Sequence, residues 1–589
     1  MSWTRPDADA LAAAVAGLTA YAAELGTQLP VPGGTWAVVD RDGVVASAAW
    51  GVADVGTHEP VRLGHRFEIG SISKVVTAIV VHQLVDEGVI DLDRPVVDVV
   101  PWLDLGQPYA ALTPRHLHSH TDGLVLGADA MPDERAQVWA MRDLVRSGEP
   151  GERFHYSNLG FMVLGQLVAH VTGRPFAEVV HERVLAPLGA SGARADIRHA
   201  DRATMASGHW PLHDDRMWAP GDAVSPATWF EVSAADGHVA ADVEELGTLA
   251  SFLLGDGSPV LSPESIGRLV SPWAPGGEGV CVWNGTPAVE ESRYGLGVNV
   301  ELIDGHHVVT HGGGMVGYAT FLLADRDAGF GVVVLTNGTG EQPLAHAFAR
   351  VVHHVMAALG EGRPAPELPD PGAALRGAEI APSLLGTFEG TAYDGTSLRI
   401  TVREGDDGRV EVATRGDMGG GTDATAATRD GETAGRLLRT WSDRHSTDHP
   451  GLRTFPLTPD GDRWLYGPYV LTATASGASG TAAVGDGGSR ELLPELEPWL
   501  MAVVGHYRSW SPWYPGFRIV ARDGVLVLIA PGGVEAPGDD EALVELEPGV
   551  FRIGADPWMP ERLHVGPVVD GHAVTVTRDG CVYSRHFTP

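Results

Sequence analysis

The stretch FEIGSISKVVTAIVVHQLVDEGVI, residues 67–90, contains Lys74, and no second lysine occurs among the 589 residues of the chain. The other 40 of the 41 basic residues are arginines. Apolar residues recur at helical spacing over 72–87, and the turn DEG ends the pattern, which predicts a helix. Ser71 is therefore expected at the start of that helix, where backbone N–H groups have no intrahelical partner.

The spacing of Ser71 and Lys74 indicates a nucleophile beside its base. A serine hydroxyl is a weak nucleophile until a neighbouring group takes its proton. Residues three apart lie on one helix face, and a desolvated lysine can lose the proton that an arginine keeps. A chain that otherwise uses arginine is expected to keep a lysine where a proton must leave. The pattern S-x-x-K also arises by chance, so the argument needs further motifs.

Two later motifs add polar groups of the right kind. Tyr156 and Asn158 lie in GERFHYSNLGF (151–161), just before a predicted helix. They offer a phenol for proton transfer and an amide that both donates and accepts hydrogen bonds.

The second motif, HGGG (311–314), follows a predicted strand and begins with His311. Gly313 and Gly314 would let a substrate approach the backbone closely. The N–H groups of Ser71 and Gly314 are therefore candidates to form an oxyanion hole.

Composition limits the class of protein. The chain is too long for one core, and 44% hydrophobic with 20% charged residues is typical of globular domains. A net charge of −35 argues against nucleic acid and anionic membranes as partners. The N-terminus predicts an amphipathic helix in place of a signal peptide, and no uninterrupted apolar run reaches 18 residues, so we expect a cytoplasmic protein. Two cysteines, Cys281 and Cys581, are too few for a disulfide framework.

The predicted secondary structure and the composition divide the chain into several regions. Alternating strands and helices fill 1–362, a proline-rich linker is expected at 363–382, and short strands with many turns follow. A Gly/Ala/Ser-rich linker at 473–491 separates two tail domains, 383–472 and 492–589, each predicted to be a small antiparallel β-barrel. The pentapeptides LLGTF (384–388) and VVGHY (503–507) are each followed, thirteen residues after the glycine, by an arginine, which indicates a duplicated module.

Order, spacing and flanks of the three motifs resemble the serine β-lactamase and penicillin-binding-protein superfamily, in its class C-like branch of esterases and D-amino-acid peptidases. The shared features are F-x-I-G-S-x-S-K, Y-x-N, and an H-x-G where many relatives have K-T-G, with matching flanks at 112–124, 150–158 and 293–298. The resemblance covers roughly 10–360. With its two tail domains, the chain is similar to the three-domain D-aminopeptidases.

The resemblance implies an α/β (α+β) catalytic domain with an inserted helical subdomain, followed by the two barrels. It implies that Ser71 is acylated, that Lys74 activates it and that Tyr156 is the general base and leaving-group acid. Asn158, His311, Gly313 and Gly314 would bind substrate. No metal or organic cofactor is expected.

The function expected is hydrolysis of amide or peptide bonds through an acyl-enzyme, as a D-residue-preferring aminopeptidase or amidase. An esterase, an acyltransferase or a thioesterase that cyclises peptides stays open on the same scaffold, as does a silent binding protein. The partner expected is a small-molecule or peptide substrate, and a homodimer is one open assembly. HLHSH (116–120) nearly matches a metallo-hydrolase pattern but departs from it at His120 and Thr121, so a structural segment is favoured.

Overall fold

The computed structural model describes residues 3–368 except 104–105, 107–108, 128–132, 213–222, 280–285 and 340–342, six strands within 386–473, and residues 497–585 except 523, 531–533 and 535–539. Cys281 and most of the predicted linkers 363–382 and 473–491 lie outside the described residues.

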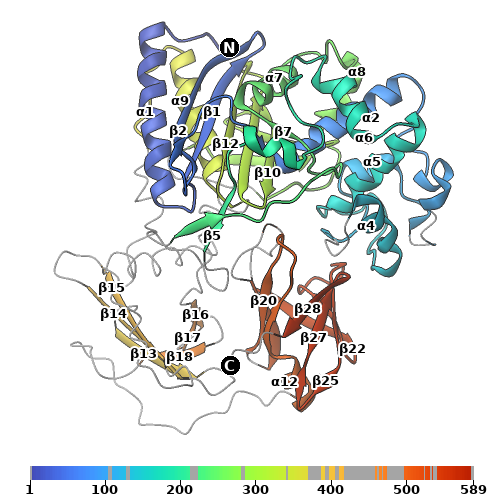
Figure 1. The fold of residues 1–589 in the computed structure, drawn as a ribbon, viewed down its shortest axis with the longest axis vertical. Coiled ribbons are helices and arrows are strands. Elements are labelled where there is room, and N and C mark those ends of the chain that lie inside the picture. The colour runs from blue at the N-terminus through green and yellow to red at the C-terminus, as the bar shows by residue number, and fades with distance from the viewer. Residues whose placement is uncertain are drawn as a thin grey trace.

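An eight-stranded antiparallel sheet forms the centre of the N-terminal part (Figure 1). Strands from the end of this part insert beside the first strands, because β1 pairs with both β2 and β12. The prediction that the returning chain completes the sheet is confirmed. In sheet order the strands are β3 (Glu59–Pro60), β2 (Gly43–Asp54), β1 (Gly33–Asp40), β12 (Phe330–Thr336), β11 (Tyr318–Asp325), β10 (His306–Met315), β9 (Asn299–Ile303) and β8 (Val289–Tyr294).

Strand side chains alternate between two hydrophobic cores, as the two-residue period of a strand requires. In β1, Trp36 and Val38 face a core shared with α1 and α9, whereas Ala37 and Val39 face the larger core on the other side. The helices of this part are α1 (Ala8–Thr27), α2 (Ser73–Asp86), α3 (Pro114–His118), α4 (Glu134–Ala140), α5 (Asn158–Thr172), α6 (Phe176–Val180), α7 (Val243–Leu254), α8 (Pro263–Leu269) and α9 (Leu344–Gly360).

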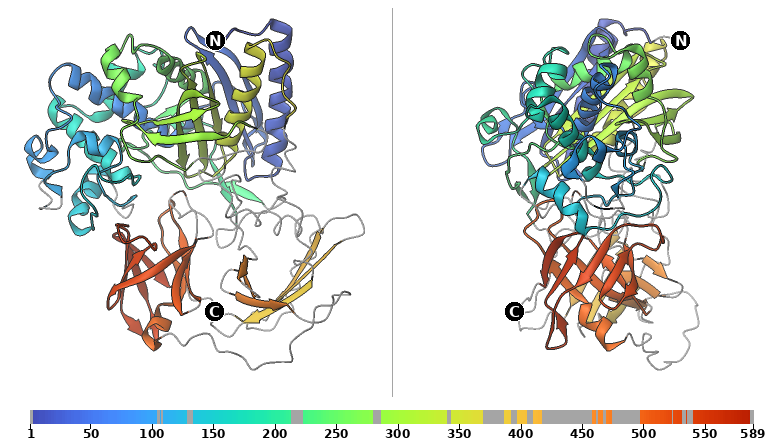
Figure 2. Two further views of the ribbon diagram at one scale, coloured as in Figure 1. Left: turned by 180° about the vertical axis from the view of Figure 1, so that it is seen from behind. Right: turned by 90° about the vertical axis from the view of Figure 1, so that its right-hand side faces the viewer.

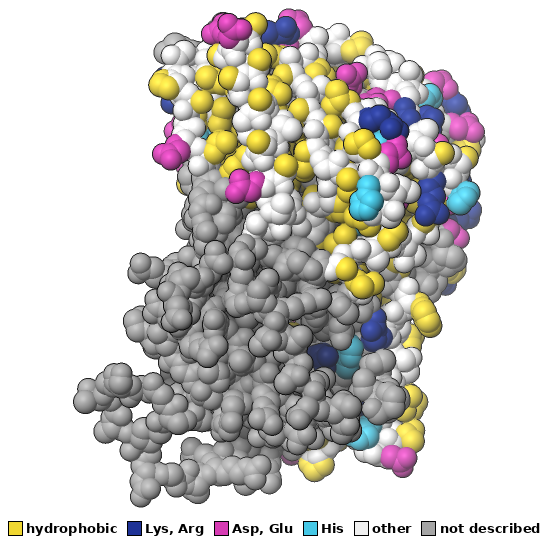
Figure 3. Space-filling model, turned by 60° about the vertical axis from the view of Figure 1, so that its left-hand side comes forward, with side chains coloured by type: hydrophobic (Ala, Val, Ile, Leu, Met, Phe, Trp, Pro, Cys, Tyr) yellow, Lys and Arg dark blue, Asp and Glu magenta, His cyan; other side chains and the backbone are white. Residues whose placement is uncertain are grey.

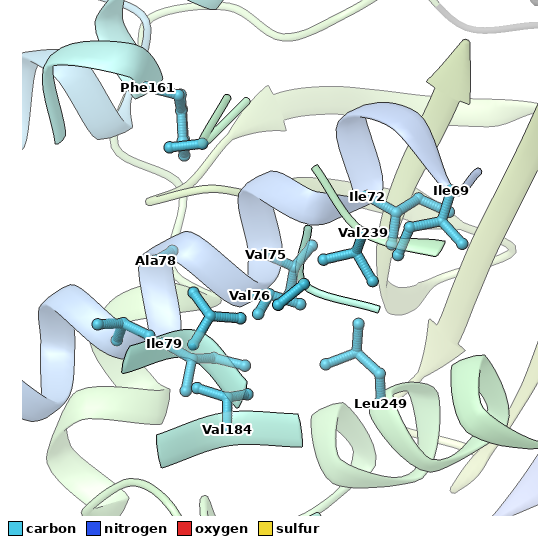
Figure 4. Close-up of a cluster of buried hydrophobic side chains, with 14 of the residues drawn as sticks. Ile69, Ile72, Val75, Val76, Ala78, Ile79, Phe161, Val184, Val239 and Leu249 are labelled. Carbon is cyan, nitrogen blue, oxygen red and sulfur yellow. The ribbon is translucent and has the colours of Figure 1, made fainter. Parts of the chain in front are cut away.

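Helix α2 lies inside the larger core, which is why its sequence is apolar on every side. A 3₁₀ turn, η1 (Gly70–Ile72), leads into it. Figure 4 shows Val76 and Ile79 of α2 facing side chains from other elements, among them Val184 and Leu249. Packing from several elements therefore holds the η1–α2 junction in place.

Helix α1 is the predicted amphipathic helix at the N-terminus. Its buried residues Leu18, Tyr21, Ala22 and Leu25 follow the spacing i, i+3, i+4, i+7 and pack in the core shared with α9. Small apolar side chains lie on the opposite face of α1, which comes forward in Figure 3. By length and composition, α1 is the one helix in the described parts that could cross a membrane. Asp9 and Glu24 interrupt the apolar residues of α1, so the helix contains no continuous apolar run of 18 residues.

The tail contains two antiparallel β-structures (Figure 2). In the second, the predicted barrel is confirmed as a closed barrel of eight strands in the order β19-β20-β21-β22-β23-β24-β27-β28. These strands are β19 (Gly505–Arg508), β20 (Gly516–Arg522), β21 (Val525–Ile529), β22 (Glu541–Glu547), β23 (Val550–Ile553), β24 (Arg562–Val565), β27 (Thr575–Arg578) and β28 (Cys581–Arg585). A short helix, α12 (Pro498–Val503), precedes them.

The first tail structure is described as a six-stranded sheet in the order β15-β14-β13-β18-β17-β16. Its strands are β13 (Gly386–Thr391), β14 (Ser397–Glu404), β15 (Val410–Gly416), β16 (Thr458–Asp460), β17 (Arg463–Tyr466) and β18 (Tyr469–Ala473). Gly386 and Gly505, the matched glycines, each begin the first strand of their β-structure. The register of the first two strands differs, because Gly386 pairs with Val402 whereas Gly505 pairs with Ile519. The exact boundaries of the domains stay predictions.

Two predicted elements differ from the structure. The strand expected over 294–302 is wrong at its start, because residues 295–298 form the turn of a hairpin in which Tyr294, at the end of β8, pairs antiparallel with Asn299, at the start of β9. Gly297 in this turn has a φ of +100°, which favours glycine. The helix expected over 175–187 is α6 followed by a π-helical turn, His181–Leu185.

Candidate active site

Ser71 lies in η1, half-buried, immediately before α2. The residue before it, Gly70, has a φ of +52°, which favours glycine. A Cβ on Gly70 would also lie 2.8 Å from the carbonyl oxygen and 2.9 Å from the nitrogen of Gly314. Gly70 therefore lets the Ser71 turn lie directly against strand β10.

Lys74 is completely buried and its amine reaches three acceptors. Its Nζ lies 2.9 Å from Ser71 Oγ, 2.8 Å from Asn158 Oδ1 and 3.0 Å from the backbone carbonyl of Asp236. The structure thus brings together two of the sequence motifs, S-x-x-K and Y-x-N, around one nitrogen.

Tyr156 lies beside the same amine. Lys74 Nζ is 5.0 Å from the centroid of the Tyr156 ring, and the His120 ring packs against that ring at 4.2 Å between centroids. Burial is the largest cause that holds the pKa of His120 well below its usual range, so this imidazole is neutral. Its Nδ1 accepts the backbone N–H of Ser157 at 3.1 Å, which fixes the segment between Tyr156 and Asn158.

The glycines of HGGG lie in close contact with the turn that contains Ser71. A Cβ on Gly313 would lie 2.0 Å from the carbonyl oxygen of Ile69 and 2.3 Å from Thr320 Oγ1. Thr320 Oγ1 donates to that same Ile69 carbonyl at 2.9 Å, so strand β11 also holds the turn. The backbone of Gly314 therefore lies beside Gly70, next to Ser71, and an oxyanion hole formed by the N–H groups of Ser71 and Gly314 stays a prediction.

His311 is completely buried, and both of its ring nitrogens have partners within the protein. Nδ1 donates to the Gly312 carbonyl at 2.6 Å, so Nε2 accepts from the Tyr294 hydroxyl at 2.8 Å. Burial lowers the pKa of His311 to about 3. The imidazole is therefore neutral, and a direct contact between His311 and substrate stays a prediction.

Sequence reasoning missed three groups that shape this site. The Asp236 carbonyl binds the amine through the backbone, which no motif marks. His120, noted only for a metal pattern, carries a φ of +51°, and Tyr294 lies in the flank RYGLGV that was used only as a family signature. For His120 and Tyr294, the aromatic residues that lie near the motifs in the sequence could have indicated a role in the site.

The histidines of HLHSH do not converge. His116 Nδ1 faces the start of α3 at Thr113, His118 Nδ1 faces the Pro114 carbonyl, and His120 belongs to the active site. No group of three or more histidine, cysteine or acidic side chains suited to a metal ion occurs in the described parts of the chain. The structural interpretation of this stretch fits the contacts.

Glu68, three residues before Ser71, offers a test of burial. Burial raises the pKa of Glu68 to about 8. Between the ordinary value of about 4.5 and 8, the folded protein binds one proton more than the unfolded chain, so its stability falls as pH rises. Glu68→Gln has no group that titrates at this position. We expect the free energy of unfolding of the variant, relative to that of wild type, to rise by at least about 1.4 kcal/mol from pH 5 to pH 9, which corresponds to one pKa unit.

Urea unfolding at both pH values measures this difference. Glu24→Gln on the exposed side of α1 is the control and should follow wild type at both. An equal effect of Glu68→Gln at pH 5 and pH 9 would contradict the raised pKa.

Comparison with known proteins agrees with the fold. The profile of the beta-lactamase family matches residues 18–356, more than half of the chain, and the chain therefore belongs to this family. A D-aminopeptidase of Cereibacter sphaeroides (strain ATCC 17029) is 30% identical over 353 residues, covering 56% of this chain and 61% of that protein. Penicillin-binding protein 4* of Bacillus subtilis is 24% identical, covering 62% of this chain and 81% of its own.

Among solved structures, an octameric penicillin-binding protein homologue from Pyrococcus abyssi has the same fold, with a TM-score of 0.52 and 21% identity. It covers 68% of this chain and 90% of its own. The chain spans about three fifths of the length of the D-aminopeptidases that it matches.

Proposed function

We propose that the chain is a serine hydrolase that cleaves amide bonds through an acyl-enzyme on Ser71, as an aminopeptidase or amidase that prefers D-residues. The observation that carries the proposal is the 2.9 Å contact between Ser71 Oγ and a completely buried lysine amine. A buried amine is the type of base that can take a serine proton near neutral pH. The D-aminopeptidases among the relatives support the class of substrate.

The reaction follows from the positions of the groups. Ser71 Oγ attacks the amide carbonyl while its proton passes to Lys74, with the Tyr156 phenol beside the amine. The N–H groups of Ser71 and Gly314 receive the developing oxyanion. The Tyr156 phenol gives its proton to the departing amine and is reprotonated by Lys74, and water then hydrolyses the ester on Ser71 with the same groups in reverse. Asn158, which already holds Lys74, is close enough to orient the substrate amide.

The electrostatics favour a substrate with a free ammonium group. His311 is neutral, so it provides no charge to attract a substrate carboxylate. The net charge of −35 repels anions and attracts cations.

A panel of paired substrates tests the proposal. We expect D-alanine p-nitroanilide to be cleaved faster than its L-isomer and at least about tenfold faster, in kcat/KM, than N-acetyl-D-alanine p-nitroanilide. Equal or faster cleavage of the acetylated compound would remove the ammonium argument. Exclusive turnover of p-nitrophenyl esters would identify an esterase, and a macrocyclic product from a peptidyl thioester would identify a cyclase.

A further inference from the structure

The eight-stranded barrel contacts the catalytic part close to the active site. In Figure 1 the barrel lies below the helical region that contains α4 and α5, and the views in Figure 2 agree. One part of the contact is made by the loop between β23 and β24. In this loop the Trp558 carbonyl accepts a hydrogen bond from Ser147 Oγ, and the Trp558 ring packs on the His155 ring at 5.5 Å between centroids.

One carboxylate of this loop binds two segments of the catalytic part at once. Glu561 is buried, and its Oε1 lies 2.7 Å from His155 Nε2 and 3.3 Å from the backbone nitrogen of Leu126. His155 directly precedes Tyr156 in the chain. The Leu126 carbonyl accepts the backbone N–H of Asn158 at 2.8 Å. Glu561 therefore touches the neighbours of both Tyr156 and Asn158.

The contact joins two titratable groups, and the direction of both pKa shifts favours the charged form of each. Burial lowers the pKa of His155, but the hydrogen bond and charge of Glu561 outweigh burial, and the net pKa is raised. Burial raises the pKa of Glu561, and the hydrogen bond from His155 outweighs it in turn. Asp122 and Asp579 also favour the imidazolium. A charge-assisted hydrogen bond of this kind is stronger and geometrically tighter than a neutral one.

The same segment is held from its other side. The backbone N–H of His155 donates to the His120 carbonyl at 2.8 Å, and the His120 ring packs on Tyr156. His120 thus supports the Tyr156 ring from within the catalytic part, whereas Glu561 supports the preceding residue from the barrel. Removing either support would free the phenol to move relative to Lys74.

We propose that Glu561 is a positioning residue, which makes the C-terminal barrel part of the working active site. Through His155 and Leu126 it fixes the segment that carries Tyr156 and Asn158. The inference rests on the proposed function, because it assigns Glu561 to the acylation of Ser71. Glu561 itself contacts His155 and Leu126, and its effect on Tyr156 and Asn158 is indirect.

The test is Glu561→Gln in the full-length chain, with Glu545→Gln on the exposed side of the same barrel as the control. Displacing catalytic groups by about 1 Å can reduce rates about 100-fold. We expect kcat to fall about 10- to 100-fold with KM changed less than about threefold, after correction for the folded fraction by active-site titration. A kcat within about twofold of the control would overturn the inference.

A double-mutant cycle separates positioning from general damage. If Glu561 acts through His155, the double variant His155→Gln/Glu561→Gln loses no more activity than either single variant. Losses that multiply would contradict a shared action. Should Glu561→Gln not fold, His155→Gln carries the test alone, and an unchanged kcat in that variant would overturn the inference.

Labelling with a fluorophosphonate distinguishes this inference from the proposed function. Wild type is expected to be labelled at Ser71, and Glu561→Gln at least about fivefold more slowly. Absence of label at Ser71 in wild type would contradict the proposed function. Labelling at equal rates in wild type and Glu561→Gln would contradict only the role of Glu561.

Discussion

Lys74→Arg is expected to reduce kcat/KM for D-alanine p-nitroanilide by about 10³- to 10⁴-fold, near the upper end for the loss of a general base. A guanidinium keeps its proton at any usable pH, so it cannot accept the proton of Ser71 Oγ. The amine it replaces is completely buried and lies 2.9 Å from that oxygen. Steady-state kinetics on the purified variant, with circular dichroism to confirm folding, measures the loss.

The control is the reverse substitution, arginine to lysine, at a position on the surface. Arg183 forms an ion pair with Glu87 at 2.7 Å, and Arg183→Lys preserves that charge far from the proton transfer. Exposed pairs contribute little, so its activity should stay within about twofold of wild type. Activity of folded Lys74→Arg within tenfold of wild type would contradict the role of Lys74 as a base.

Gly313→Ala is expected to have the second largest effect. The new methyl group would lie 2.0 Å from the Ile69 carbonyl, so either β10 or the Ser71 turn must move. Overpacking of this kind costs about 1–3 kcal/mol of stability, and a shift of the Ser71 turn by about 1 Å reduces the rate about 100-fold. Thermal unfolding and kcat/KM on one preparation measure both effects.

The neighbouring glycine provides a matched control for this substitution. A Cβ on Gly312 meets only Phe321 Cδ2, at an ordinary contact distance of 3.8 Å. Gly312→Ala should therefore keep both stability and activity close to wild type. Equal losses in the two variants would mean that the HGGG motif tolerates no side chain for a reason other than the contact with Ile69.

Site residues could be predicted to lie close together where they belong to one sequence motif. Ser71 and Lys74 are neighbours because they lie three residues apart in one helical turn, and Asn158 begins a helix whose pattern is visible in the sequence. The strands β11 and β12 are also clear, because they are short, mostly apolar runs that are buried along their whole length.

Contacts between distant segments could not be predicted in this way. Glu561 and His155 are 406 positions apart, and no spacing rule joins them. The Asp236 carbonyl binds Lys74 through the backbone, so the identity of its side chain carries no signal. The turn at 295–298, which divides the strand expected at 294–302 into β8 and β9, is set by the pairing of Tyr294 with Asn299 in the folded sheet.

Acylation of Ser71 is the most direct test of the account. Rapid quenching of the reaction with a slow D-aminoacyl ester, followed by proteolysis and mass spectrometry, locates the acyl group. The account predicts a covalent adduct on the peptide that contains Ser71 in wild type, formed at least about 100-fold more slowly in Lys74→Arg. Turnover without an adduct, or an adduct that forms equally fast in both proteins, would contradict it.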